Sequence, residues 1–309
     1  EVNGELSYNN DVISTKGVTL NWREMPLALI VNADNNDKNF YKTLINLQAK
    51  WPESSWKKEL PQRLEKYGHG QLDWRGDLTL KMRPQGGFSY ELLIGSTLET
   101  LDIALPVPYK KSAGEALNVT VKVSGQEDSS VLNAQLGGEL NFYGELNHNK
   151  VQFTKAHLML GNENMLIPTD GFHITTNLST ASLEEWQPLV LDILNSIEQA
   201  SENNEEESVA LLSAPNRIRG EIAHLDILGQ KLTEVSFNLL DEEQWWLLDL
   251  NAKEARTKVK FYPDWHLQGV EIDAEFIHLT VADELDNDNE NENANESKNE
   301  LITPQVKQT

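Results

Sequence analysis

Apolar and polar residues alternate with a period of two along much of this chain, most clearly over residues 117–123, 172–178 and 270–276. Successive side chains of a β-strand lie on opposite faces of its sheet, so each segment predicts a strand with one apolar and one wet face. The same reasoning predicts further strands over 78–82, 88–94, 151–154, 235–239, 246–251 and 258–262.

Short runs of turn-forming residues separate these segments, including 84–87, 124–125, 147–149 and 228–230. Strands joined by such short turns are typical of hairpins, which pair antiparallel neighbours. The sequence therefore predicts a mainly β fold with a mainly antiparallel sheet.

A short phrase also recurs: Gly, any residue, Leu or Ile, any residue, then an aromatic residue or His. Its copies begin at Gly4, Gly70, Gly138 and Gly220, which are 66, 68 and 82 positions apart. Self-similarity at a regular period is the signature of a repeat architecture, in which each unit packs against the next. We interpret each copy as the start of a strand set.

One segment departs from this pattern. Ser182 and Glu185 have the spacing of a helix capping box, and apolar residues follow at helical intervals. We expect an amphipathic helix near 183–198 and, with the acidic run that follows, an insertion over about 182–208. A shorter helix is expected around 60–67, where Pro61 suits a first turn.

The formal net charge is −23, and much of it falls in the acidic stretches 198–207 and 283–300. No basic stripe is present to neutralise phosphates, so nucleic acid and anionic membrane surfaces are disfavoured as partners. We expect 282–309 to be an acidic disordered tail or linker. The run 286–290 resembles the start of a calcium loop but lacks the required glycine.

The chain has no cysteine, does not begin with Met and contains no apolar run near 18 residues. We therefore expect neither a signal peptide nor a membrane span here, and interpret the chain as a piece of a longer polypeptide, with a repetitive segment over 1–281.

Motifs for chemistry are missing as well. None of the seven histidines lies two or four positions from another, and no nucleophile elbow, P-loop or dinucleotide fingerprint occurs. No catalytic residue, metal site or cofactor is predicted. The eight tryptophans favour packing within the sheet, with sugar stacking or a membrane interface as the weaker readings.

The segment from Ser96 to Gly114, which includes Leu105-Pro-Val-Pro108, resembles a signature of YhdP-like members of the AsmA-like family of bacterial envelope proteins, to which TamB is related. The resemblance extends over roughly 4–279, through 67–76, 183–189 and 262–266. It implies a periplasmic, non-catalytic protein with a long, curled β-groove that is implicated in moving phospholipid toward the outer membrane. It also implies an inner-membrane anchor outside this chain.

On this basis the expected fold is an elongated, curled antiparallel sheet whose apolar face forms a groove for phospholipid acyl chains. The pattern alone leaves a closed, dry sandwich core as an open alternative. Two other functions remain open: a β-rich scaffold for outer-membrane protein assembly, with envelope proteins as partners, and a carbohydrate-binding sandwich. The residues expected to line the groove are Leu117, Val119, Val121, Val123, Phe172, Ile174, Val270 and Ile272.

Overall fold

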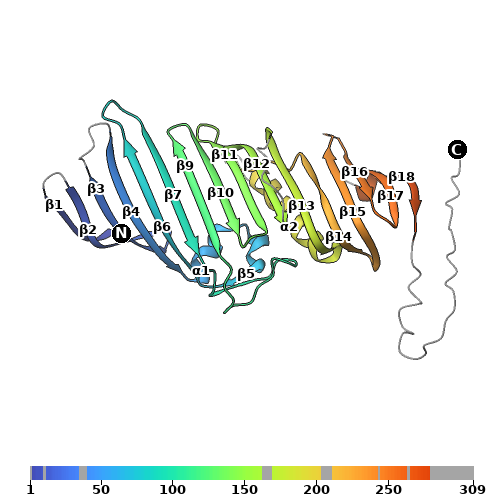
Figure 1. Cartoon of the computed structure of the whole chain (residues 1–309), viewed down its shortest axis with the longest axis horizontal. Coiled ribbons are helices and arrows are strands. Elements are labelled where there is room, and N and C mark those ends of the chain that lie inside the picture. Colours follow the sequence, from blue (N-terminus) through green and yellow to red (C-terminus); the bar gives the residue numbers. More distant parts are fainter. Residues whose placement is uncertain are drawn as a thin grey trace. The chain divides into compact units, whose positions relative to one another are not determined.

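The computed structural model describes residues 2–9, 12–34, 40–161, 169–202, 211–242, 244–262 and 265–278 (Figure 1). Strands account for most of them. The chain divides into two compact units: the first comprises 1–178 and 185–218, and the second comprises 179–184 and 219–309. Each unit is described below by itself.

Long strands of the first unit follow one another in chain order, and in the described part of the unit β1 pairs with β2 alone, so the sheet does not close on itself. These strands are β1 (Val2–Asn9), β2 (Val12–Trp22), β3 (Met25–Asp34), β4 (Tyr41–Trp51), β6 (Leu72–Met82), β7 (Phe88–Ser96), β9 (Val119–Gln126), β10 (Ser129–Leu136), β11 (Leu140–Asn147), β12 (Gln152–Gly161) and β13 (Gly171–Ser182), the last as far as Leu178.

Strand pairing from β1 to β12 is antiparallel throughout, whereas β12 and β13 are parallel. A hairpin cannot join parallel neighbours, because the chain must first return to the strand end where it started. Strand β12 ends at Gly161, and β13 begins at Gly171. The predicted mainly β class with an antiparallel sheet is confirmed, with this one parallel pair as an addition.

Period-two segments in the sequence correspond closely to observed strands. The segment predicted over 246–251 is strand β16, and those over 88–94 and 172–178 lie inside longer strands. Strands β2, β3 and β4 were not predicted individually. The repeated phrase falls inside β1 and β14, and in the other two copies its glycine lies two positions before the first residue of β6 or β11.

A capping segment, residues 52–70 and 97–118, covers one end of the strands of the first unit. It contains α1 (Glu53–Trp56), the 3₁₀ helices η1 (Lys57–Glu59) and η2 (Gln62–Tyr67), and the two-stranded sheet of β5 (Gly68–Gly70) and β8 (Leu101–Ile103). The helix expected around 60–67 is thus the 3₁₀ helix η2, with Pro61 directly before it.

Polar contacts hold the capping segment together. The Glu53 carboxylate forms an ion pair with Lys57 at 2.6 Å and accepts the Gly70 backbone N–H at 2.7 Å. The hydrogen bond from Lys57 is the largest cause of a Glu53 pKa of about 2. Trp56 donates its indole N–H to the Gly70 carbonyl at 3.0 Å. These bonds fix α1 against β5.

Helix α2 (Leu183–Glu202) confirms the helix predicted near 183–198 and runs slightly further. At the start of this helix, Ser182 Oγ donates to Glu184 at 2.8 Å. Glu184 in turn accepts the Leu228 backbone N–H at 2.6 Å. The neighbouring carboxylate therefore takes the serine hydroxyl at the strand-to-helix junction.

The part of α2 in the first unit is anchored by a buried carboxylate. Asp192 accepts the Tyr67 hydroxyl at 2.7 Å and pairs with Lys66 at 2.7 Å, and Trp186 meets Tyr109 edge to face. Hydrogen bonds from Lys66 and Tyr67 lower the Asp192 pKa. This contribution to docking is present above the ordinary aspartate pKa and is lost as pH falls through the lowered one.

Replacing Asp192 with Asn is expected to loosen α2, because the amide cannot form the ion pair with Lys66 and leaves that lysine without its partner. Hydrogen exchange measured by mass spectrometry should show faster exchange in α2 and unchanged exchange in β6–β10. Glu185→Gln, an exposed carboxylate on the same helix, is the matched control. Equal exchange in both variants would contradict this anchoring role.

In the second unit, β14 (Arg217–Ile227, from Arg219), β15 (Gln230–Asp241), β16 (Trp246–Asn251), β17 (Ala255–Phe261) and β18 (Val270–Ile277) follow in chain order, and the short helix α3 (Trp265–Gln268) precedes the last. The pairs from β15 to β18 are antiparallel. The acidic tail expected over 282–309 lies outside the described residues, as does the calcium-like run 286–290.

Candidate functional site: an apolar sheet face

Register across the first unit places apolar side chains in continuous rows on one face of its sheet. Val121 of β9 stands opposite Ile94 of β7 on one side and Ala134 of β10 on the other. The neighbouring row joins Leu92, Val123 and Leu132 in the same way. The rows continue through Leu29, Leu47, Ile45 and Leu78 toward β3, and through Phe142, Leu158 and Ile174 toward β13.

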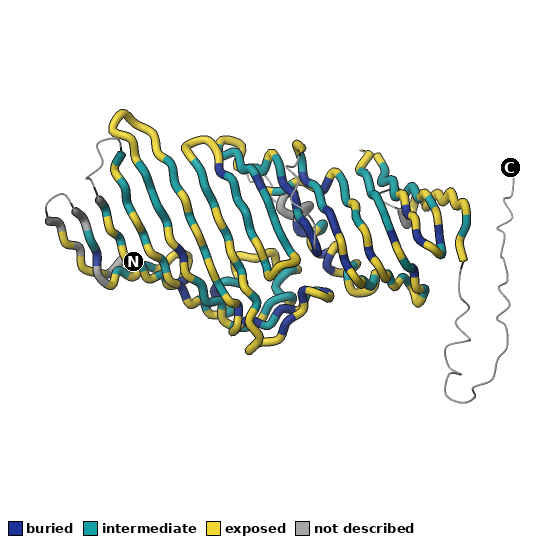
Figure 2. Tube along the Cα trace, in the orientation of Figure 1, coloured by how far each residue is buried: buried dark blue, intermediate teal, exposed yellow. Residues whose placement is uncertain are grey.

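Most of these side chains are half-buried, neither covered nor fully exposed. Figure 2 shows strands β6 to β11 mainly in the intermediate and exposed colours, with buried positions gathered near β12 and β13. Phe172 is 7% exposed, whereas Val121 and Ile174 belong to the intermediate class. A row of aliphatic side chains packed only against its in-sheet neighbours has this partial exposure, because no second layer covers its outer side.

The capping segment closes one end of this face. Leu98, Leu101 and Ile103 form a buried cluster, and apolar-face residues of the sheet pack against it, among them Leu72, Val119 and Leu136. The opposite strand ends carry exposed apolar residues instead: Tyr41, Met82 and Phe88 are 44%, 42% and 36% exposed. The face therefore has a closed end and an open end.

Glycines on the face make room for aromatic rings. A Cβ on Gly125 would lie 2.8 Å from Tyr90 Cε1, and a Cβ on Gly144 would lie 2.5 Å from Phe153 Cε1. The rings of Tyr90 and Phe153 thus lie over the backbone of neighbouring strands and restore the apolar contact that glycine lacks.

Six of the eight predicted lining residues belong to the first unit. Val119, Val121 and Val123 share the apolar face with Phe172 and Ile174, and Leu117 packs against the capping cluster. Val270 and Ile272 are 43% and 62% exposed on β18 of the second unit, opposite Phe261 and Val259. That a lipid contacts these residues remains a prediction.

Sequence reasoning missed much of the face. The alternation of Tyr41, Ile45, Leu47 and Trp51 along β4 was available as a signal, and so was that of Leu132 with Ala134 along β10. Strand pairing then aligns each predicted position with apolar residues of the neighbouring strands and so forms a row. The alternation within a single strand does not show which strands pair.

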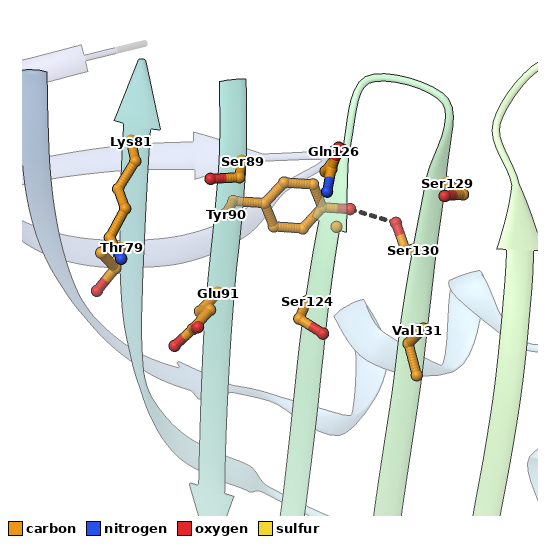
Figure 3. Close-up of a pocket in the computed structure, with 11 residues that line it drawn as sticks. Thr79, Lys81, Ser89, Tyr90, Glu91, Ser124, Gln126, Ser129, Ser130 and Val131 are labelled. Atoms are coloured by element: carbon orange, nitrogen blue, oxygen red, sulfur yellow. Dashed lines mark hydrogen bonds between the residues drawn. The ribbon is translucent and has the colours of Figure 1, made fainter. Parts of the chain in front are cut away.

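The opposite face of the same strands is polar. A cavity of about 300 Å³ lies over β6, β7, β9 and β10, and Figure 3 shows its lining. Ser89, Glu91, Ser124 and Gln126 alternate along their strands with apolar-face residues, so they lie on the other side of the sheet. Tyr90, Gly125 and Ser130, which stand on the apolar face, are also among the lining residues, so the cavity adjoins the open end of the apolar rows.

Within the described residues, no group of three or more His, Asp or Glu side chains is arranged to hold a metal ion. Among the helices that the structure describes, none has both the length and the apolar character needed to cross a membrane.

The fold and the face define the class: an open β-sheet protein whose sheet presents one extended apolar side. The YhdP protein family model matches residues 1–308, and the chain belongs to this family. A curated relative, the intermembrane phospholipid transporter YhdP of Escherichia coli (strain K12), is 27% identical over 141 residues. That stretch is 46% of this chain and 11% of the relative. No solved structure matches the chain.

Proposed function

We propose that this chain is a non-catalytic part of a lipid-transport protein and that the apolar face of its first unit holds phospholipid acyl chains. The observation that carries the proposal is the set of half-buried apolar rows across β3 to β13, closed at one end by the capping cluster. Membership of the YhdP family and the similarity to a phospholipid transporter support it. An exposed apolar surface of this extent marks a binding site in soluble proteins.

Burial energies show why such a face suits transport. An acyl chain of about sixteen carbons gains on the order of 12 kcal/mol on leaving water, at about 0.8 kcal/mol per CH₂. Successive rows offer similar apolar contacts, so an acyl chain that moves from one row to the next changes its free energy little. The lipid then avoids most of the cost of crossing water.

The wider setting is part of the proposal. We place the chain in the periplasm, as a segment of a longer protein anchored in the inner membrane by a region outside this sequence. Transport would serve the permeability barrier of the outer membrane. Val270 and Ile272 would contact acyl chains on the second unit, where they are exposed.

The second candidate is a β-rich scaffold for outer-membrane protein assembly, favoured by the exposed strand β18. In that strand only Phe276 is not classed as exposed. An open strand edge can pair with another chain. The apolar rows of the first unit play no part in this function.

Native mass spectrometry of the purified chain separates the two functions. The expected result is co-purified phospholipid, released when the chain is unfolded. A chain that carries no lipid and takes up none from phospholipid vesicles would contradict the transport proposal and favour the scaffold.

A further inference from the structure

Toward its open end, the apolar face of the first unit holds a hydrogen-bonded polar group. Tyr90 of β7 reaches across Gly125 of β9 to Ser130 of β10, and their hydroxyls are hydrogen-bonded (Figure 3). Ser130 is 4% exposed and contacts His148 Nε2 at 2.5 Å. His148 Nδ1 lies 2.7 Å from the Glu127 carbonyl oxygen.

The donor and acceptor chemistry of these groups sets the direction of each hydrogen bond. The Glu127 carbonyl can only accept, so Nδ1 of a neutral His148 carries the proton and Nε2 accepts. Ser130 must then donate to His148, and Tyr90 must donate to Ser130. In this state the Tyr90 hydroxyl has lone pairs to offer a ligand but no proton.

The depth of the group matches the length of a lipid tail. Leu136 packs against the capping cluster, and Ser130 lies six residues earlier on the same strand, about 20 Å away at ~3.3 Å per residue. Between them on this face lie only Ala134 and Leu132. One leaflet contains about 15 Å of hydrocarbon, half of a core ~30 Å thick. A tail that reaches the closed end thus leaves about 5 Å for the glycerol and its ester groups, which places the phosphate near Tyr90.

From these observations we propose that Tyr90, Ser130 and His148 form a subsite for the phosphodiester of a phospholipid whose tails extend along β7, β9 and β10 toward the capping cluster. The inference rests on the proposed function and adds the orientation of the lipid. Tyr90 touches the ligand, whereas Ser130 and His148 position its hydroxyl.

A phosphate offers only acceptors, so it binds when each of these hydrogen bonds reverses its direction. His148 then carries a proton on both ring nitrogens and donates through Nε2 to Ser130, Ser130 donates to Tyr90, and Tyr90 donates to the phosphate. The charged groups on the adjoining hairpins are Arg83, Glu127, Asp128 and Lys150. Arg83 lies near Glu127, and the Asp128 backbone carbonyl accepts the His148 backbone N–H. Binding of the phosphodiester is therefore coupled to a proton on His148.

The test compares two lipids with identical tails, dipalmitoyl phosphatidylglycerol and dipalmitoylglycerol, each offered to the whole chain from vesicles and measured as bound lipid. We expect Tyr90→Phe and Ser130→Ala to reduce the preference for the phospholipid by about tenfold, as for a lost hydrogen bond to a charged group. Binding of dipalmitoylglycerol should not change. An unchanged preference in both variants would overturn the subsite, and the acyl-chain function would stand.

The pH dependence of lipid binding shows whether His148 positions the Tyr90 hydroxyl or only packs in the fold. Because the phosphodiester binds together with a proton on His148, phosphatidylglycerol binding should weaken as pH rises, and dipalmitoylglycerol binding should stay constant. His148→Gln should flatten the profile, and His173→Gln, on the opposite face, should retain it. A sloping profile in His148→Gln would contradict the role of His148.

Inorganic phosphate is tested as a competitor of the phospholipid. We expect it not to displace phosphatidylglycerol at equal concentration, because it makes no contact with the apolar rows. Displacement would assign the group to free phosphate and overturn the lipid subsite. A chain that binds neither lipid would overturn the subsite and the proposed function together.

Discussion

Val121→Asp is expected to reduce the phospholipid carried by the chain at least tenfold while leaving the sheet folded. Val121 lies mid-row between Ile94 and Ala134, where an acyl chain would contact it. An ionised carboxylate in contact with hydrocarbon loses its hydration without gaining a partner, which strongly disfavours binding. Bound lipid, counted by native mass spectrometry, is the measurement.

Thr120→Asp is the matched control, because Thr120 is the exposed neighbour of Val121 on the same strand and lies on the polar face. It should keep the normal lipid load. Ile174→Asp on β13 should behave like Val121→Asp, since Ile174 stands opposite Leu158 in the same set of rows. Normal loading of both apolar-face variants, with circular dichroism showing folded sheets, would remove the apolar face as the binding surface.

Gly161→Ala is expected to destabilise the first unit by about 2 to 4 kcal/mol. Gly161 has φ +84°, and a Cβ there would lie 1.8 Å from the Asn177 carbonyl oxygen on the parallel partner strand. Its backbone N–H also donates to the Glu139 carbonyl and to Tyr109 Oη at 2.9 Å. Neither the backbone conformation nor the space at this position admits a side chain.

Gly95→Ala provides the comparison, since nothing lies within 4 Å of a Cβ at Gly95 and its φ is not in the left-handed region. This variant should be neutral or slightly more stable. Urea unfolding followed by tryptophan fluorescence measures both. If Gly161→Ala unfolds at the same urea concentration as Gly95→Ala, the tight β12–β13 junction is not required for stability.

Tyr109 shows why this junction is sensitive. The ring is 5% exposed, its hydroxyl donates to Glu139 and accepts from Gly161, and burial raises its pKa to about 12. The same ring meets Trp186 of α2. One buried side chain thus joins the capping segment, the end of β12 and the helix.

Much of the fold could be predicted from single-strand patterns. Strands such as β7, β13 and β16 alternate cleanly, and the 183–198 helix has both a helical period and a distinct start. The parallel β12–β13 pair could not be predicted, because alternation is the same in parallel and antiparallel strands. The pattern also did not reveal that Glu184 accepts both the Ser182 hydroxyl and the Leu228 backbone N–H.

The candidate site was predicted in part. Val119, Val121 and Val123 share one face because strand geometry requires it, and Ile174 shares that face through pairing across four intervening steps. Leu117, also expected in the groove, packs on the capping cluster, and Phe172 is 7% exposed; lipid contact at either residue stays a prediction. Neither the cluster nor its location could be read from local periodicity.

By itself the sequence determined that the chain forms many amphipathic strands and one inserted helix, because period-two and period-3.6 patterns depend only on local backbone geometry. The family resemblance and the absence of spaced catalytic residues also came from the sequence. The tertiary structure alone decided which strands are neighbours, that a capping cluster closes one end of the apolar rows, and that Tyr90, Ser130 and His148 meet. The contact of Tyr90 with Ser130 joins residues 40 positions apart and that of Ser130 with His148 joins residues 18 apart, and only strand pairing brings the three together.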